Sequence, residues 1–251
     1  MYDFRGRVAL VTGASSGIGR AVAQLYAQNG AKVVVSDVND EGGAETVRLI
    51  EQAGGEAAYF HADVSDPQAC EALVQFALDR YGRLDFACNN AGIAGESNPT
   101  GSYSIEGWKK VIDINLNGVF YCMRYEIPAM LKNGGGSIVN MASILGQVGF
   151  ANAPAYVTAK HGLIGLTRNA AIEYAKSNIR VNSIGPAFIK TPLLAPLESD
   201  PNLMNMIVAL HPIGRLGQPE EVAELVMWLS SEKASFVTGS YYAVDGGYLA
   251  Q

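Results

Sequence analysis

Cysteine and histidine are scarce in this sequence, and their scarcity excludes several kinds of site. The chain of 251 residues has three of each. They are Cys70, Cys88, Cys122, His61, His161 and His211. The cysteines form no CxxC pair and the histidines lack metal-ligand spacing, so we expect neither a disulfide framework nor a metal site. This cysteine usage predicts a cytoplasmic protein.

Charged residues and long apolar runs are also few. Charged residues make up 17% of the chain, the net charge is −6, and lysine and arginine form no cluster. A nucleic-acid surface is therefore not predicted. No apolar run reaches the roughly 20 residues that a membrane-spanning helix needs. Hydrophobic residues nevertheless make up 49% of the chain, which indicates a large buried core.

Short apolar runs alternate along the chain with stretches of helical periodicity. The runs predict strands at 8–12, 32–36, 57–61, 84–88, 137–141, 179–184 and 241–244. Helices are predicted at 17–29, 41–53, 67–80, 104–132, 155–177 and 220–229. This alternation is typical of an α/β protein with a doubly wound parallel sheet of about seven strands and helices on both faces. Because no linker or repeat divides the chain, we predict a single domain over residues 1–251.

A glycine-rich turn lies between the first predicted strand and the first predicted helix. In the stretch TGASSGIG, Gly13 permits the tight turn, Gly17 lets the backbone approach a pyrophosphate, and Gly19 lets the helix pack closely on the sheet. The helix N-terminus offers free N–H groups to phosphates. The predicted cofactor contacts in this turn are Gly13, Ser15, Ser16, Gly17, Ile18 and Gly19. Strand, turn and helix together indicate a dinucleotide site.

Asp37 follows the second predicted strand. A carboxylate there can accept both hydroxyls of an adenosine ribose and would repel a 2′-phosphate. Since neither Val38 nor residues 14–16 provide a cation for that phosphate, the sequence favours NAD over NADP. The alternative is an ordinary N-cap or turn aspartate, because Asn39 and Asp40 follow.

Tyr156 is the only one of the twelve tyrosines with a lysine four residues later, Lys160. On a helix this spacing places both side chains on one face. An ammonium about 4 Å from the phenol oxygen, at an effective dielectric of about 20, supplies roughly the 4 kcal/mol needed to lower a tyrosine pKa from about 10 to about 7. Ser143 adds a second hydrogen-bonding group for the same substrate oxygen. The alternative is an accidental pair on an exposed helix.

These motifs, taken together, resemble the short-chain dehydrogenase/reductase family from Val8 to Gly247. The matching motifs are TGASSGIG, Asp63-Val64, Asn89-Asn90-Ala91-Gly92, Asn115, Ser143 and Tyr156-x-x-x-Lys160. The resemblance implies a Rossmann-type fold and a catalytic tetrad of Asn115, Ser143, Tyr156 and Lys160. It assigns further cofactor contacts to Asp63, Val64, Asn90, Ala91, Gly92, Tyr156, Lys160, Pro186, Ile189 and Thr191. One departure is Ala187, which stands where the family has glycine and would be strained at positive φ.

The resemblance further implies that Asn115 holds a water connecting Lys160 to solvent, that Lys160 holds the nicotinamide ribose, and that the chain forms a homotetramer. We expect an NAD(H)-dependent enzyme that interconverts a secondary alcohol and a ketone, with Tyr156 as general acid/base. A substrate-covering lid is predicted at about 187–217. Its apolar residues are Leu193, Leu194, Leu197, Leu203, Met204, Met206, Ile207 and Leu210. Further predicted wall residues are Ile93, Leu145, Val148 and Phe150. The alternative is that the lid and wall residues pack against the protein's own core or a neighbouring subunit.

The sequence leaves open two other enzyme activities and one non-catalytic role. Glu96, Gln147, Asn152 and His211 could bind hydroxyls, which would suit a sugar or polyol dehydrogenase. A 3-oxoacyl-[acyl-carrier-protein] reductase is disfavoured by the missing NADP cation and the acidic chain. A non-catalytic nucleotide-binding scaffold on the same fold is disfavoured because the whole tetrad is present.

Overall fold

Seven parallel strands form one sheet in the computed structural model, which describes residues 2–195 and 200–251. The strand order is β3-β2-β1-β4-β5-β6-β7, and every neighbouring pair is parallel. The strands are β1 Val8–Thr12, β2 Lys32–Asp37, β3 Glu56–His61, β4 Phe86–Asn89, β5 Gly136–Met141, β6 Ile179–Pro186 and β7 Tyr241–Val244. The predicted doubly wound parallel sheet is confirmed.

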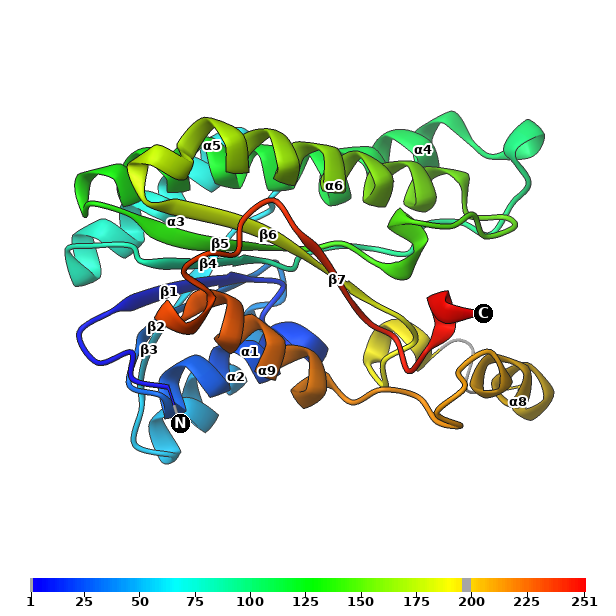
Figure 1. Ribbon diagram of the computed structural model, residues 1–251, viewed down its shortest axis with the longest axis horizontal. Coiled ribbons are helices and arrows are strands. Elements are labelled where there is room, and N and C mark those ends of the chain that lie inside the picture. Colours follow the sequence, from blue (N-terminus) through cyan, green and yellow to red (C-terminus); the bar gives the residue numbers. More distant parts are fainter. Residues whose placement is uncertain (1, 196–199) are drawn as a thin grey trace.

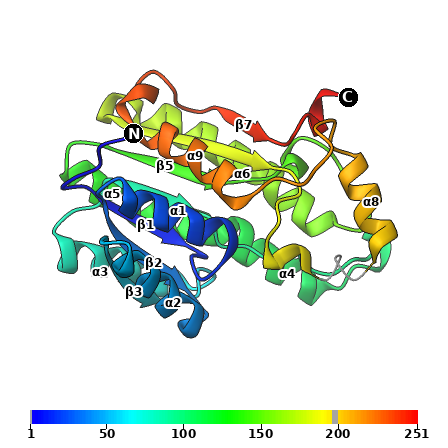
Figure 2. The ribbon, with the colours of Figure 1, turned by 90° about the horizontal axis from the view of Figure 1, so that it is seen from below.

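Helices cover both faces of this sheet (Figure 1). Helices α1, α2 and α9 lie on one face, and α3, α4, α5 and α6 lie on the other; Figure 2 looks onto the face with α1 and α9. Their bounds are α1 Gly17–Gln28, α2 Asp40–Gln52, α3 Pro67–Tyr81, α4 Ile105–Ile112, α5 Gly118–Lys132, α6 Pro154–Tyr174 and α9 Pro219–Ser230. A further helix, α8 Pro201–Ala209, lies beyond the edge where β6 and β7 end.

The helical stretch predicted over 104–132 is confirmed from Ile105 to Lys132, but its backbone hydrogen bonding changes in the middle. A π-helical turn, Asp113–Asn117, separates α4 from α5. The wider turn carries Asn115 inward, where its amide bonds both backbone groups of Ile93: Asn115 Oδ1 accepts from Ile93 N at 2.9 Å and Nδ2 donates to Ile93 O at 2.8 Å. Such turns are frequent at functional sites.

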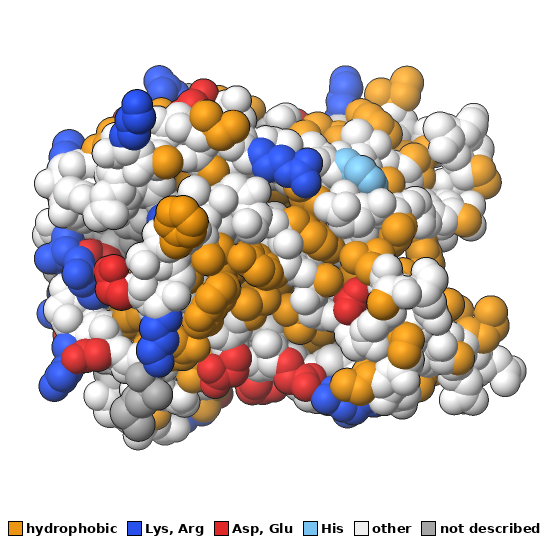
Figure 3. All heavy atoms as spheres, in the orientation of Figure 1, with side chains coloured by type: hydrophobic (Ala, Val, Ile, Leu, Met, Phe, Trp, Pro, Cys, Tyr) orange, Lys and Arg blue, Asp and Glu red, His pale blue; other side chains and the backbone are white. Residues whose placement is uncertain are grey.

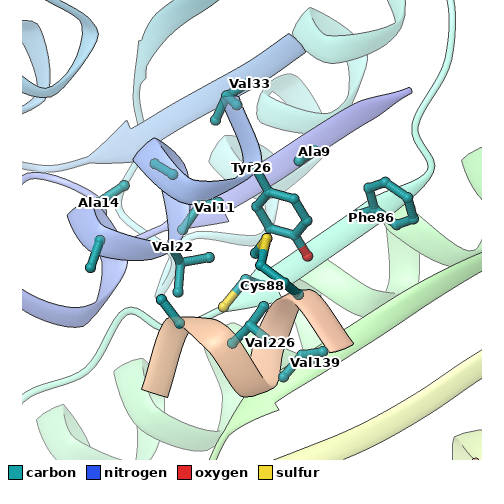
Figure 4. Packing of buried hydrophobic residues seen from close by; sticks show 14 of the residues in the cluster. Ala9, Val11, Ala14, Val22, Tyr26, Val33, Phe86, Cys88, Val139 and Val226 are labelled. Carbon is teal, nitrogen blue, oxygen red and sulfur yellow. The ribbon is translucent and has the colours of Figure 1, made fainter. Parts of the chain in front are cut away.

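Tyr26 fixes α1 against the sheet and against α9. Its side chain is fully buried and stacks on Phe86 of β4 with ring centroids 5.6 Å apart. Figure 4 shows this ring among buried residues of the sheet, α1 and α9, with Cys88 beside it. The Tyr26 hydroxyl lies 2.6 Å from Ser230 Oγ at the end of α9. The position of α1 therefore depends on a helix more than two hundred residues later in the chain.

Because all strands are parallel, their carboxyl ends meet at one edge of the sheet. Asp37 and Pro186 are the last residues of β2 and β6 at this edge. The loops that follow β1, β3, β4 and β5 contain Gly13, Asp63, Asn90 and Ser143. Ligands of open α/β sheets bind at such an edge, where the strand order reverses. Here the order reverses between β1 and β4.

Candidate active site

The glycine turn after β1 leaves its backbone open to an anion. Gly13 and Gly17 have φ of +63° and +52°, which favours glycine. A Cβ on Gly19 would lie 2.1 Å from the carbonyl oxygen of Gly13, so a larger residue does not fit. Ser16 is the N-cap of α1, but its side chain makes no capping hydrogen bond, and the first turn carries no acidic residue. This helix N-terminus is therefore suited to phosphate.

Asn90 fastens the end of β4 to the same turn. Its Nδ2 donates to the carbonyl oxygens of Thr12 and Gly13, both at 3.0 Å. In return Thr12 Oγ1 accepts from the backbone N–H groups of Asn90 and Ala91, each at 3.1 Å. The segment that follows β4 and the glycine turn are thus one hydrogen-bonded unit.

Asp37 turns its carboxylate toward the glycine turn. Its Oδ2 accepts from Ser15 N at 2.9 Å and its Oδ1 accepts from Asn39 N at 3.0 Å. The alternative that Asp37 is the cap of α2 is excluded, because Asn39 is the N-cap and accepts from Gly42 N at 3.0 Å. The other part of that alternative, a turn aspartate, is consistent with the bond from Asn39 N to Oδ1. Arg20, which the sequence analysis did not consider, donates to the carbonyl oxygens of Ser15 and Gly42.

A cavity of about 570 Å³ runs along this edge of the sheet. Most of the predicted cofactor residues line it, namely Gly13, Ser15, Ser16, Gly17, Ile18, Asp37, Asp63, Val64, Asn90, Ala91, Gly92 and Thr191. Gly19 lies behind the turn, where it allows close packing. Lys110 of α4 and Ile114 also line the cavity, although no local motif in the sequence marks them, and so does Leu193, which was predicted as a lid residue. They face it only because α4 and the segment after β6 converge there.

A smaller cavity of about 110 Å³ adjoins the first and contains the predicted catalytic groups. Ser143, Tyr156 and Lys160 line it together with Pro186 and Ile189. The two cavities share Ile18, Asn90, Gly92, Thr191 and Leu193. Asn115 lies behind this wall: a Cβ on Gly92 would be 3.2 Å from Asn115 Oδ1 and 3.8 Å from Lys160 Nζ. The fold therefore brings all four tetrad residues to one place.

Lys160 is buried and points at the carboxyl end of β5. Its side chain is on α6, and Nζ donates to the carbonyl oxygen of Met141 at 2.7 Å. The same Nζ lies 5.4 Å from the centroid of the Tyr156 ring. Because only 4% of Lys160 is exposed, burial lowers the pKa of its ammonium to about 8.

The prediction that Tyr156 has a lowered pKa was wrong for this structure. Burial raises the pKa of Tyr156 above its ordinary value, and the nearby Ser143 hydroxyl opposes the rise only in part. The physical reason is that removing a phenolate from water costs free energy, and Lys160 directs its hydrogen bond to Met141. Tyr156 is a phenol here and can act as a proton donor.

The segment after β6 adopts its turn without the strain expected of Ala187. Among the described residues, the only non-glycine residues with positive φ are Asn152 and Asn178. Ala187 continues the pairing of β6 and β7, because its N–H donates to Val244 O at 3.1 Å. The substitution of alanine for glycine is therefore tolerated by the backbone.

Metal and membrane features are not found in the described part of the chain. Residues 2–195 and 200–251 contain no group of three His, Cys, Asp or Glu side chains arranged to hold a metal ion. They also contain no helix with the length and hydropathy to cross a bilayer. Cys70 and Cys122 do meet, with Sγ atoms 3.6 Å apart, and both are free thiols.

Comparison with known proteins places this geometry in a large group of enzymes. Residues 13–249 match the family described as enoyl-(acyl carrier protein) reductase. A cyclohexanol dehydrogenase from Acinetobacter sp. (strain SE19) is 54% identical over 99% of this chain and 97% of its own. A cis-4-hydroxycyclohexanecarboxylate dehydrogenase from Sinomonas cyclohexanicum is 46% identical over 98% of each chain. A solved putative 2-deoxy-D-gluconate 3-dehydrogenase from Agrobacterium tumefaciens, with bound NADP, is 36% identical with a TM-score of 0.92, covering 99% of this chain and 98% of its own.

Fold, site and relatives together define an oxidoreductase that uses a nicotinamide cofactor and interconverts alcohols and ketones. The chain belongs to the short-chain dehydrogenase/reductase family, as its sequence motifs predicted.

Proposed function

We propose that this protein is an NAD-dependent dehydrogenase that interconverts an alicyclic secondary alcohol and its ketone, with Tyr156 as the general acid/base. The observation that carries this proposal is the smaller cavity, where Tyr156, Ser143 and Lys160 meet a wall of apolar residues. That wall includes Met141, Ala142, Pro186, Ala187, Ile189, Leu193 and Leu194. A ring of CH₂ groups suits such a wall. The names of the two cyclohexane-ring relatives support the same substrate class.

The described residues divide the chemistry between them. When bound, the nicotinamide exchanges hydride at its C4, and in the oxidised form it brings a positive charge. Tyr156, as a phenol, donates its proton to the substrate oxygen when a ketone is reduced. In the opposite direction Tyr156 would first release its proton to solvent through Lys160, and the resulting phenolate would then take the proton of the alcohol. Ser143 hydrogen-bonds the same oxygen as its charge develops. Lys160 orients the nicotinamide ribose and, through Asn115 and a water, receives the proton that Tyr156 needs.

The preference for NAD rests on Asp37. Its two oxygens already accept from the backbone of Ser15 and Asn39, which fixes the carboxylate beside the cavity. A 2′-phosphate there would meet this negative charge. Arg20, the nearby cation, donates inward to backbone carbonyl oxygens and to Thr46 Oγ1 at 2.9 Å. A relative from Agrobacterium tumefaciens has bound NADP, so the cofactor preference of this chain needs a test of its own.

We also propose that the chain is one domain and that about 187–217 forms a lid over the substrate. Leu193 and Leu194 line the cavity beside Tyr156, whereas Met206 of α8 is 67% exposed. Ile207 is buried and anchors α8. Leu197, predicted for the same lid, lies outside the described residues.

A sugar or polyol substrate has less support from the side chains. Glu96 accepts hydrogen bonds from the Ser104 hydroxyl and from Asn98 Nδ2, the latter at 3.2 Å. His211 is buried, with Nδ1 2.8 Å from Ile207 O and Nε2 3.4 Å from Phe188 N. Two of the candidate hydroxyl-binding groups are thus occupied within the protein.

One experiment tests the proposal. Purified protein is incubated with NAD⁺ or NADP⁺ and a panel of cyclic, linear and polyol alcohols, and reduced cofactor is followed by absorbance. We expect turnover of cyclohexanol-type alcohols with NAD⁺ preferred, and loss of nearly all turnover in Tyr156→Phe while cofactor still binds. Equal use of the two cofactors, or near wild-type turnover in Tyr156→Phe, would contradict it.

A further inference from the structure

A carboxyl group is buried in the core at a distance from the catalytic groups. Glu126 is on α5 and is 0% exposed. Its Oε2 accepts from Asn89 Nδ2, the last side chain of β4, at 3.1 Å. No cation lies among the groups that affect its ionisation. A buried carboxylate with one neutral donor is costly, so this group requires an explanation.

Glu126 belongs to a hydrogen-bonded network that crosses the core from α5 to α6. Asn89 Nδ2 donates to both Glu126 Oε2 and Asn140 Oδ1 of β5, each at 3.1 Å. Asn140 Nδ2 donates to Thr167 Oγ1 on α6 at 3.0 Å, and Thr167 Oγ1 donates to Leu163 O at 2.9 Å. All of these side chains are at most 1% exposed.

The count of hydrogens in this network shows one missing donor. Two buried oxygens have no partner, Glu126 Oε1 and Asn89 Oδ1, and they belong to the two side chains that already face each other. Both hydrogens of the Asn89 amide are in use, and so is the Thr167 hydroxyl hydrogen. A single proton on Glu126 Oε1 would satisfy both oxygens at once, because a carboxylic acid and an amide can exchange paired hydrogen bonds.

The groups around Glu126 favour this proton. The titratable side chains that face it are Cys88 on β4 and Cys122 on α5, with Cys70 of α3 behind Cys122. The pKa values of Cys88 and Cys122 are themselves raised, so both thiols stay neutral. Asn140 of β5 and Thr167 of α6 carry no charge. Burial raises the pKa of Glu126 to about 7, and the hydrogen bond from Asn89 opposes the rise.

We propose that Glu126 is a positioning residue that acts in its protonated form, donating its carboxyl hydrogen to Asn89 Oδ1 and thereby fixing the carboxyl ends of β4 and β5. The next residue after Asn89 is Asn90, which fastens the phosphate turn. The next residue after Asn140 is Met141, whose carbonyl oxygen holds Lys160. The network thus ends one residue short of Asn90 on one strand and one residue short of Met141, which binds Lys160, on the other.

Ionisation of Glu126 would weaken both ends together. The folded pKa is raised above the unfolded value of about 4.3, so the stabilisation by this group is complete below that pH and is lost as pH rises toward the folded value. Above it, the carboxylate faces Asn89 Oδ1 with no hydrogen between them. The site would therefore be held more firmly under mildly acidic than under alkaline conditions.

The first test measures protonation without using the activity. Thermal melts of wild type, Glu126→Gln and Glu126→Leu are compared at pH 5.5 and 8.5, with the exposed Glu71→Gln on α3 as control. The glutamine amide carries a hydrogen at both pH values. We therefore expect the melting temperature of Glu126→Gln, relative to that of the wild type, to rise by about 5 °C between pH 5.5 and 8.5. Glu126→Leu should melt below Glu126→Gln at both. An equal difference between wild type and Glu126→Gln at both pH values would overturn the assigned proton.

The second test measures the effect on the site, and in this part the inference rests on the proposed function. NADH binding is followed by fluorescence at the same two pH values. Because Lys160 titrates in both proteins, the ratio of wild-type to Glu126→Gln Kd isolates Glu126. We expect this ratio to rise about fivefold from pH 5.5 to 8.5, and Glu126→Leu to bind weakly throughout. A constant ratio, with Glu126→Leu binding like wild type, would overturn the positioning role. Failure of every variant to bind NADH would refute the cofactor assignment instead, since the melts stand without it.

Discussion

The pKa values of Tyr156 and Lys160 depend more on burial than on neighbouring charge. Lys160 and Tyr156 lie on one face of α6, as their spacing predicted. The pKa of Tyr156 is raised and that of Lys160 is lowered, and both shifts favour the neutral side chain. The ammonium directs its hydrogen bond to Met141 O. Burial costs a charge free energy before any partner is counted, and here the partner is a backbone carbonyl.

The pH dependence of Lys160 follows from its lowered pKa. Between about pH 8 and pH 10.4 the unfolded lysine is protonated and the folded one is neutral, so the free energy of unfolding rises with pH, by about 1.4 kcal/mol per unit. If Lys160 binds the nicotinamide ribose as proposed, cofactor affinity should fall in the same range, because the neutral lysine no longer offers an ammonium to the ribose. Chemical denaturation and NADH binding from pH 7 to 10.5 check this. Stability and affinity that change in the same direction would contradict it.

Gly19 tests the packing of the phosphate turn at the scale of one methyl group. Gly19→Ala places a Cβ 2.1 Å from Gly13 O and 2.6 Å from Asn90 Nδ2, so the turn and the Asn90 side chain must move. We expect a loss of cofactor binding of at least about tenfold, together with destabilisation of about 1–3 kcal/mol. Fluorescence titration and denaturation measure these. Gly101→Ala, which meets nothing within 4 Å, is the control and should change neither.

At the scale of elements, the strand ends are held by side chains on both edges of the sheet. The carboxyl ends carry Asn90 and the Glu126 network. At the amino ends, Asp85 accepts from Val8 N at 2.9 Å and from Arg7 Nη1 at 2.9 Å, with Arg83 Nε at 2.8 Å. These bonds join β1 to the segment before β4. They fix the register of β1 relative to β4, the two strands between which the strand order reverses.

Asp85→Ala should therefore destabilise the sheet. The substitution leaves the buried N–H of Val8 without its acceptor and removes the partner of two arginines, which costs about 3 kcal/mol. Urea denaturation measures the change. The control is Asp79→Ala, whose exposed carboxylate bonds only Gln75 at 2.7 Å and should cost no more than about 0.5 kcal/mol. Similar losses for both variants would show that the buried position has no special role.

At the scale of the whole molecule, apolar side chains extend beyond the core. In Figure 3 they gather near the middle of the face over α9 and β7. On these elements Leu225, Trp228 and Tyr242 are partly buried against the core, and Trp228 meets Tyr242 edge to face with centroids 5.9 Å apart. A patch of this kind is typical of a protein interface. It supports the proposal of a homotetramer, which the family resemblance implied.

Trp228→Glu should reduce the size of that assembly. A carboxylate on this face would be desolvated on association, which opposes the contact. Light scattering on a sizing column measures the mass, and circular dichroism verifies folding. The control is Gln52→Glu at an exposed position of α2, which adds the same charge away from the patch. A wild-type mass that is already monomeric, or a folded variant with unchanged mass, would reject this interface.

Most of the fold and much of the site could be predicted from local patterns. Every predicted strand is present, and the predicted cofactor residues from Gly13 to Thr191 line one of two adjoining cavities, except Gly19, which packs behind them. The π-helical turn at Asp113–Asn117 could not be predicted, because the hydrogen bonds between Asn115 and Ile93 join segments that are distant in sequence. Lys110 was missed for the same reason.

The sequence by itself determined the order of strands and helices, the glycine turn and the candidate reactive groups, because periodicity and glycine conformation act over a few residues. The tertiary structure decided which charges leave water. The pKa directions of Tyr156 and Lys160, and the single proton that the network of Glu126 and Asn89 requires, depend on burial by segments far apart in the chain. Desolvation is a property of the packed surroundings, which no local pattern contains.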